Sequence, residues 1–222
     1  MKTIVFDVNE TLLDLRGMRP RFVEAFGATD LLPTWFGQLL RHSLVATLTN
    51  TYAPFDVLGV DALRLVAMKA GIDISEADAV QVVDGMRHLP PHPDVRPAIT
   101  RLRDHGFGVA TLTNSPPHLL SDQLANAEVT DLFDTTMSID PVRKYKPHPD
   151  TYRSGAKRLG IDISEMRHVA AHDWDVTGAI RAGAAAAFVA RPGMALSQAS
   201  ETPDIVGSDL ETVAAAIIDI DG

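Results

Sequence analysis

Short apolar runs alternate with amphipathic segments along most of the chain. Residues 3–6 form such a run, which ends at Asp7 and predicts a buried strand of the parallel type. Similar runs recur at residues 108–113, 135–139, 168–171 and 186–190. Helical spacing of apolar positions predicts helices between and after them, over residues 94–105, 121–127, 150–160, 175–183 and 210–218. This alternation predicts an α/β fold, a Rossmann-like parallel sheet with helices on both faces.

The alternation stops between Asp14 and about Pro90. Residues 31–49, 61–71 and 75–89 read as successive helices with no clear strand among them, and Ser75 opens a helix-start signature. The proline-rich stretch that follows predicts an extended exit from this segment. We therefore predict a helical cap over residues 15–90, inserted into an α/β core made of residues 1–14 and 91–222.

Composition narrows the possible functions. The 222 residues suffice for one α/β domain with a small insertion, and the absence of cysteine excludes thiol catalysis, cysteine-ligated zinc and disulfides. The formal charge of −9 makes nucleic acid and anionic membranes improbable partners, although a few local cations could still receive an anionic substrate. The first residues lack the apolar core of a signal peptide, and no apolar run is long enough to span a membrane. We expect a cytoplasmic protein.

Polar side chains follow several of the predicted strands. Because ligands of open parallel sheets bind beyond the carboxyl ends of the strands, these side chains are candidates for a common site. Each also has an ordinary structural explanation: a helix cap or ion pair for a carboxylate, turn chemistry for a Thr-Asn pair, a solvated cation for a lysine. Their shared position at one sheet edge favours a site. The candidates are Asp7, Thr113, Asn114, Lys146 and the segment 172–175.

Four ordered motifs carry a resemblance to a known family. They read FDVNETLLD, LTNSP, YKPHPDTY and HDWDVTGA, and they span essentially the whole chain. In these motifs the sequence resembles the haloacid dehalogenase superfamily, and within it the L-2-haloacid dehalogenases. The resemblance implies hydrolysis of short 2-haloalkanoic acids to 2-hydroxy acids and halide, with no cofactor and no metal. It also suggests a homodimer.

The resemblance implies a role for each matching residue. Asp7 would displace halide from carbon and form an aspartyl ester, which water then hydrolyses. Lys146 would keep this carboxylate charged, and Thr11 would set its angle by a hydrogen bond. Three further residues are implied to receive or support the substrate carboxylate: Thr113, Asn114 and Tyr152.

A second reading is a magnesium-dependent phosphatase of the same superfamily. Those enzymes carry a second aspartate two residues after the nucleophile to protonate the leaving alcohol, whereas this chain has Asn9. Alanine stands at the first acidic position of the fourth motif, which leaves Asp175 as the remaining acid. A third reading, a binding module on an inactive fold, conflicts with the retained charges of Asp7, Lys146 and Asp175. We favour dehalogenation.

The fourth motif departs from the family pattern at His172, where the family has asparagine. A neutral imidazole can take a proton from water, and a nearby carboxylate would orient it. Glu10 is the first candidate for that partner, with Asp173 and Asp175 behind it. The hypothesis is that a His172–Glu10 pair activates the water that attacks the ester; the alternative is a hydrogen-bonded structural histidine.

The cap departs from the family as well. The family places Trp-Arg early in the second cap helix, with the arginine receiving halide, and here the comparable pair is Trp35-Phe36. Arg41 lies five residues further on, well round the helix, so its reach to the site is open. Phe36 with Leu40 could wall a small dry pocket, or Trp35 and Phe36 could simply pack the cap. Halide binding would then fall to two other groups: Asn114 and Trp174 N–H.

Overall fold

The computed structural model describes residues 2–27 and 31–222 and contains one six-stranded sheet. All strand pairs are parallel, in the order β3-β2-β1-β4-β5-β6. The strands are β1 (Thr3–Phe6), β2 (Val109–Thr113), β3 (Thr135–Ser138), β4 (Met166–Ala170), β5 (Ala185–Val189) and β6 (Ile205–Gly207). The predicted parallel α/β fold is confirmed.

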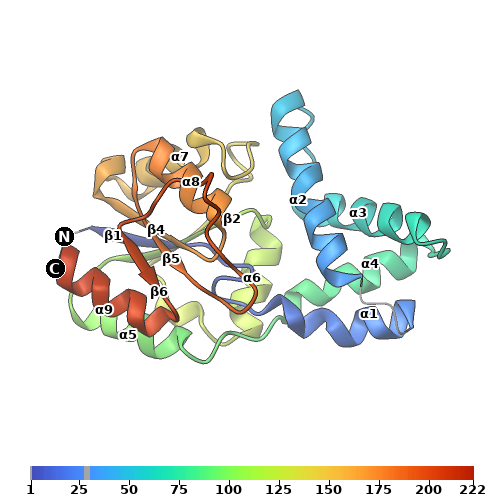
Figure 1. Cartoon of the computed structure of the whole chain (residues 1–222), viewed down its shortest axis with the longest axis horizontal. Coiled ribbons are helices and arrows are strands. Elements are labelled where there is room, and N and C mark those ends of the chain that lie inside the picture. Colours follow the sequence, from blue (N-terminus) through green and yellow to red (C-terminus); the bar gives the residue numbers. More distant parts are fainter. Residues whose placement is uncertain (1, 28–30) are drawn as a thin grey trace.

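Helices cover both faces of the sheet, which explains why its inner strands read as continuous apolar runs. In Figure 1, α5 (Val95–Asp104) and α9 (Leu210–Asp221) lie together on one face, and α7 (Pro149–Leu159) and α8 (Asp173–Ala182) lie on the other. All residues of β2 and β4 are buried. The connection after β2 forms α6 (Pro117–Asn126), and two short 3₁₀ turns, Thr130–Leu132 and Ile163–Glu165, precede β3 and β4.

A group of helices between β1 and β2 projects from one end of the sheet (Figure 1). We call it the cap. It comprises two 3₁₀ turns, Leu15–Met18 and Gly85–His88, and the helices α1 (Arg19–Phe26), α2 (Leu32–Thr49), α3 (Phe55–Lys69) and α4 (Glu76–Asp84). At the start of α4, Ser75 Oγ accepts a hydrogen bond from the Asp78 amide, as its sequence signature predicts.

Several predicted elements have different bounds in the structure. The helix expected over 121–127 starts at residue 117, where two prolines allow a helix to begin, and the one expected over 61–71 starts at Phe55. The helix expected over 75–89 ends at Asp84 and continues as a 3₁₀ turn. Two elements, α1 and β6, were missed because one is a single eight-residue helix rich in charge and the other has three residues.

None of the helices within the described ranges combines the length and apolarity that crossing a membrane requires.

Candidate active site

The site lies where the strand order reverses. β1 has β2 on one side and β4 on the other, and the connections after these strands lead in opposite directions across the sheet. Such a switch point opens a crevice at the carboxyl ends of the strands. Asp7 directly follows β1, its amide donating to Val169 O on β4 at 3.0 Å. The candidate nucleophile therefore stands at the centre of the sheet edge.

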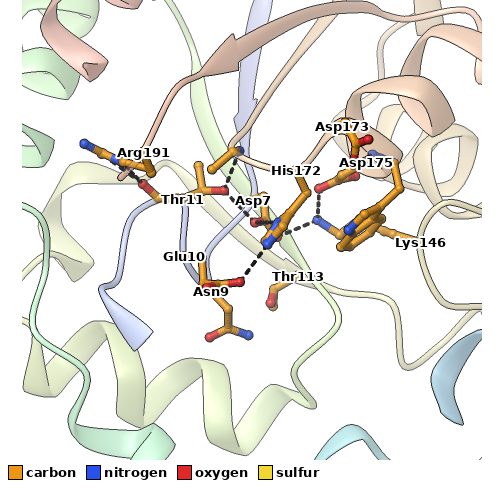
Figure 2. A network of polar contacts seen from close by, with 12 residues as sticks. Asp7, Asn9, Glu10, Thr11, Thr113, Lys146, His172, Asp173, Asp175 and Arg191 are labelled. Atoms are coloured by element: carbon orange, nitrogen blue, oxygen red, sulfur yellow. Dashed lines mark hydrogen bonds and ion pairs between the residues drawn. The ribbon is translucent and has the colours of Figure 1, made fainter. Parts of the chain in front are cut away.

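The two carboxylate oxygens of Asp7 are held by different partners (Figure 2). Lys146 Nζ lies 2.6 Å from Oδ1, and Thr11 Oγ1 donates to Oδ2 at 2.6 Å. The Thr11 hydroxyl also accepts a hydrogen bond from the Ala171 amide at 3.0 Å, and its own hydrogen points to Asp7 because an ionised carboxylate can only accept. These contacts fix the rotation of a carboxylate that is 5% exposed.

Lys146 neutralises two buried carboxylates at once. Its ammonium, which has no exposed side-chain surface, also lies 2.6 Å from Asp175 Oδ2. Burial alone would raise the pKa of Asp7, but the charge of Lys146 and the neighbouring His172 hold that pKa below its ordinary value. Burial would lower the pKa of Lys146, whereas Asp175 and Asp7 together raise it. The resting site thus holds an ionised Asp7 and a charged lysine.

Two aromatic side chains contact Asp175. Tyr152 on α7 donates its hydroxyl to Asp175 Oδ1 at 2.5 Å, and burial beside this carboxylate raises the pKa of the phenol well above its usual value. His168 on β4 places Nε2 3.0 Å from Asp175 Oδ2, without the alignment of a hydrogen bond, and packs edge-on against Tyr152. No feature of the sequence marks His168 as a site residue, because it lies inside a strand.

His172 stands between two carboxylates at the start of α8. Its Nε2 lies 2.8 Å from Glu10 Oε2, and its Nδ1 lies 3.7 Å from Asp7 Oδ2, a distance of ion pairing rather than hydrogen bonding. Burial lowers the pKa of the imidazole, but the contacts with Asp7 and Glu10 outweigh it and raise the pKa to about 9. A neutral imidazole has one N–H and would turn a bare lone pair toward one of these carboxylates. Both the charges and the geometry favour the imidazolium.

Glu10 reaches His172 from an unusual backbone conformation. Its φ is 65°, in the left-handed region where side chains other than glycine are disfavoured. The other carboxylates expected behind His172 point elsewhere: Asp173 accepts from the Trp174 amide and Ser200 Oγ, and Asp175 faces Lys146. Glu10 is thus the one of the three that contacts the imidazole.

Asn9, two residues after Asp7, is fully engaged in packing the core against α6. Its Nδ2 donates to Ser115 Oγ at 3.1 Å, and its Oδ1 accepts from Gln123 Nε2 at 2.8 Å. All three side chains are buried. An amide cannot act as a general acid, and this one is also tied away from the nucleophile.

The Thr-Asn pair after β2 borders the same edge. Thr113 Oγ1 accepts from the Ser115 amide at 3.2 Å, and Asn114 Oδ1 accepts from the Lys146 amide at 3.1 Å. Asn114 therefore helps to place the lysine-bearing loop. As in the sequence prediction, turn chemistry accounts for part of this pair; the Asn114 amide donor has no hydrogen-bond partner within residues 2–27 and 31–222.

Two apolar rings, one from the cap and one from α8, pack against His172. The Phe36 ring centroid is 6.4 Å from that of His172, and the Trp174 ring stacks on the imidazole at 4.9 Å. Leu40 is half-buried and packs against the core. Trp35 is completely buried and donates to Gly59 O within the cap, so it packs the cap. Arg41 donates to Gln38 on its own helix rather than to a site residue.

The Lys146 ammonium lies between Asp7 and Asp175, 2.6 Å from one oxygen of each, and supplies positive charge to both carboxylates. No group of three or more potential metal ligands occurs among the described residues. The donors at this edge suit an anionic substrate next to a charged lysine and histidine better than they suit Mg²⁺.

The sequence matches a known protein family and several known enzymes. The family model for haloacid dehalogenase-like hydrolases matches residues 1–183. The chain belongs to this family. It is 29% identical to the (S)-2-haloacid dehalogenase of Pseudomonas sp. (strain YL), over 96% of this chain and 93% of that protein. It is 28% identical to haloacetate dehalogenase H-2 of Moraxella sp. (strain B), over 92% of each chain.

A solved structure of the family extends the likeness to three dimensions. The L-2-haloacid dehalogenase of Xanthobacter autotrophicus, with chloropropionic acid covalently bound, superposes with a TM-score of 0.93 at 26% identity and covers 99% of both chains. The helical cap and the sheet therefore have the same arrangement in a protein that has been captured as a covalent complex.

Proposed function

We propose that this haloacid dehalogenase-like hydrolase converts short 2-haloalkanoic acids to 2-hydroxy acids and halide. The observation that carries the proposal is the state of Asp7: ionised, buried and held through both oxygens, with Asn9 in place of a general acid. Such a site suits a leaving group that departs without a proton. Halide is such a group, whereas an alkoxide is not. The names of the similar enzymes support the same substrate class.

In the first step, one Asp7 oxygen attacks C2 of the substrate in line with the carbon–halogen bond. The C–O bond of an ester forms, and the electron pair of the breaking bond leaves with the halide. Thr113 and Asn114 would receive the substrate carboxylate, and Lys146 adds a positive charge beside it. The side-chain amide of Asn114 and the indole N–H of Trp174, whose backbone amide already donates to Asp173, are the candidates for halide binding, with the ring of Phe36 excluding water.

In the second step, water attacks the ester carbonyl carbon of Asp7. We assign the proton transfer to His172, oriented by Glu10 at 2.8 Å. In the resting enzyme the imidazole carries a proton because two carboxylates face it. Esterification removes the charge of Asp7, so the pKa of His172 falls and its proton leaves to solvent. The neutral ring then accepts a proton from the attacking water as the Asp7 carboxylate is restored.

This assignment sets the order of proton release. Overall, the substrate and one water give a hydroxy acid, a halide ion and one proton. Because His172 starts and ends each cycle as the imidazolium, the released proton leaves at ester formation. An enzyme whose base is neutral at rest would release it at ester hydrolysis instead.

The test is a single turnover in H₂¹⁸O, with enzyme in excess over 2-chloropropionate. We expect one ¹⁸O atom in the Asp7 side chain, found by peptide mass spectrometry, and no label in the first-formed hydroxy acid. Asp7→Asn should release no halide. Label that appears directly in the product, with none in Asp7, would overturn the proposal. Halide release from fluoro-, chloro- and bromoacetate then defines the range of halogens.

Phosphate-ester hydrolysis remains a second candidate because of one observation. The protonated His172, 3.7 Å from Asp7, could supply the proton that a leaving alcohol needs. Cleavage of p-nitrophenyl phosphate with Mg²⁺, lost on addition of EDTA, would favour this alternative. Halide release that is indifferent to EDTA would favour the dehalogenase.

A further inference from the structure

A buried arginine holds the loop that carries the nucleophile. Residues 7–14 form no long helix or strand, and they bring Asp7, Glu10 and Thr11 to the site. Arg191, just after β5, donates from Nε and Nη2 to the carbonyl oxygen of Thr11 at 3.0 and 2.9 Å. Figure 2 shows this guanidinium on the far side of Thr11 from Asp7.

Arg191 is itself held by a second partner, Asp94. Its Nη1 donates to Asp94 Oδ2 at 2.6 Å, and the same oxygen accepts from the Leu210 amide at 2.8 Å. Asp94 precedes α5, and Leu210 opens α9. The side chains of Arg191 and Asp94 are 7% and 11% exposed. The arginine therefore ties the reactive loop to helices on one face of the sheet.

The position of the Thr11 peptide affects residues that act in both chemical steps. The side chain of Thr11 orients Asp7 for attack on carbon, and the adjacent residue, Glu10, orients His172 for ester hydrolysis. Glu10 holds a disfavoured backbone conformation, so the loop needs an external constraint to keep it there. Two parallel N–H groups of a guanidinium fix the direction of one carbonyl, which a single donor does not.

We propose that Arg191 is a positioning residue for both steps, holding the Thr11 carbonyl so that Thr11 meets Asp7 and Glu10 meets His172. The proposal rests on the proposed function for its kinetic part only. If Arg191 only filled space in the core, an apolar side chain would stabilise the fold as well, because a buried ion pair adds little net stability over well-packed apolar groups. The forked contact with one backbone carbonyl is what distinguishes positioning from filling space.

The experiment compares Arg191→Lys and Arg191→Ala with wild type. The lysine variant keeps a positive charge opposite Asp94 but cannot donate two N–H groups from a rigid plane to the Thr11 carbonyl. We expect kcat to fall about 100-fold in either variant, with KM changed much less, since a misplacement of about 1 Å in a reacting group has that effect. Ester formation and ester hydrolysis, timed separately by mass spectrometry, should both slow. If only one step slows, or if kcat of folded Arg191→Lys stays within about threefold of wild type, the proposal is wrong.

Chemical rescue adds a readout that a merely structural role does not move. A small cavity of about 30 Å³ borders Arg191 and Glu10, and removing the Arg191 side chain would enlarge it toward Thr11. Methylguanidinium at millimolar concentration should raise kcat of this variant saturably, and methylammonium should not. Equal effects of the two cations would contradict the forked contact.

The matched control is Arg167→Ala. Arg167 is also a buried arginine, but it lies on β4 and pairs with Asp204 and with Asp221, at the opposite end of α9 from Leu210. We expect it to lose stability while each folded molecule keeps its kcat. An equal loss of kcat in this control would overturn the specific role of Arg191.

One measurement needs no substrate. NMR titration of the His172 ring should give a lower pKa in Arg191→Lys than in wild type, because Glu10 no longer stays at its 2.8 Å contact. If wild type releases no halide, the proposed function fails, and this titration still decides the role of Arg191. An unchanged His172 pKa in Arg191→Lys would refute the positioning role of Arg191.

Discussion

The charge of His172 is the feature with the clearest quantitative consequence. Folding raises the pKa of this imidazole from 6.5 to about 9, because the contacts with Asp7 and Glu10 outweigh its burial. The folded state therefore favours the protonated form. The resulting stability is fully present below pH 6.5 and is lost as the pH rises through about 9.

The magnitude follows from the same two values. A difference between 6.5 and about 9 corresponds to about 3 kcal/mol of unfolding free energy, an upper figure for a single group. His172→Gln removes the titration and keeps a polar side chain of similar reach. The difference in unfolding free energy between wild type and His172→Gln should thus shrink by up to about 3 kcal/mol between pH 6.5 and 9.

Urea denaturation followed by circular dichroism at a series of pH values measures this difference. Other groups that titrate in both proteins cancel in the comparison. The same comparison, made between Glu10→Gln and the double variant Glu10→Gln/His172→Gln, should show a smaller change in the stability difference with pH, since one of the two carboxylates has lost its charge. If wild type and His172→Gln lose stability in parallel through the whole window, the imidazole is neutral at rest and the order of proton release given above is wrong.

Three further predictions concern neighbouring features. Gly178→Ala should destabilise the fold by about 1–3 kcal/mol in urea and slow ester formation, because a Cβ there would lie 2.5 Å from Pro147 Cβ and 2.6 Å from the Tyr152 hydroxyl oxygen; unchanged stability would contradict this packing. Glu10→Gly should be more stable than Glu10→Ala by about 1 kcal/mol of unfolding free energy, and should therefore unfold at a higher urea concentration, because only glycine adopts φ 65° freely. Equal urea midpoints for the two variants would rule out backbone strain at this position. In stopped flow with a pH indicator, proton release should coincide with the halide burst, and release during ester hydrolysis would show that His172 starts neutral.

The sequence was sufficient for the first five strands of the sheet, whereas the three-residue strand β6 was not predicted. Buried parallel strands read as apolar runs, and polar residues at their ends meet at one edge, which made Asp7 and Lys146 candidates for one site. Their pairing was implied by the family resemblance, and the two side chains are in contact at 2.6 Å. The His172–Glu10 contact was also expected from the sequence, and the contact is present at 2.8 Å. The roles assigned to these residues, and the homodimer suggested by the resemblance, stay predictions.

Other parts of the site were not accessible from sequence. His168 sits within an apolar strand, where nothing in the spacing marks its contact with Asp175. Arg191 follows the fifth strand in a tail with no motif, and its partner atom is a backbone oxygen, which has no residue-type signature. The reach of Arg41 depended on the rotation of α2, and the structure turns its guanidinium toward Gln38.

The two ends of the cap segment lie side by side. The Asp14 amide donates to Pro90 O at 2.8 Å, the His92 amide donates to Leu12 O at 2.9 Å, and Leu13 and Pro91 form an isolated antiparallel bridge. An inserted segment whose entry and exit touch can be exchanged without stretching its host. Grafting the corresponding segment of another family member between these two points would transplant the walls around Asp7 while leaving its nucleophile, lysine and histidine in place. The junction is therefore a natural cut site for swapping substrate preference between relatives.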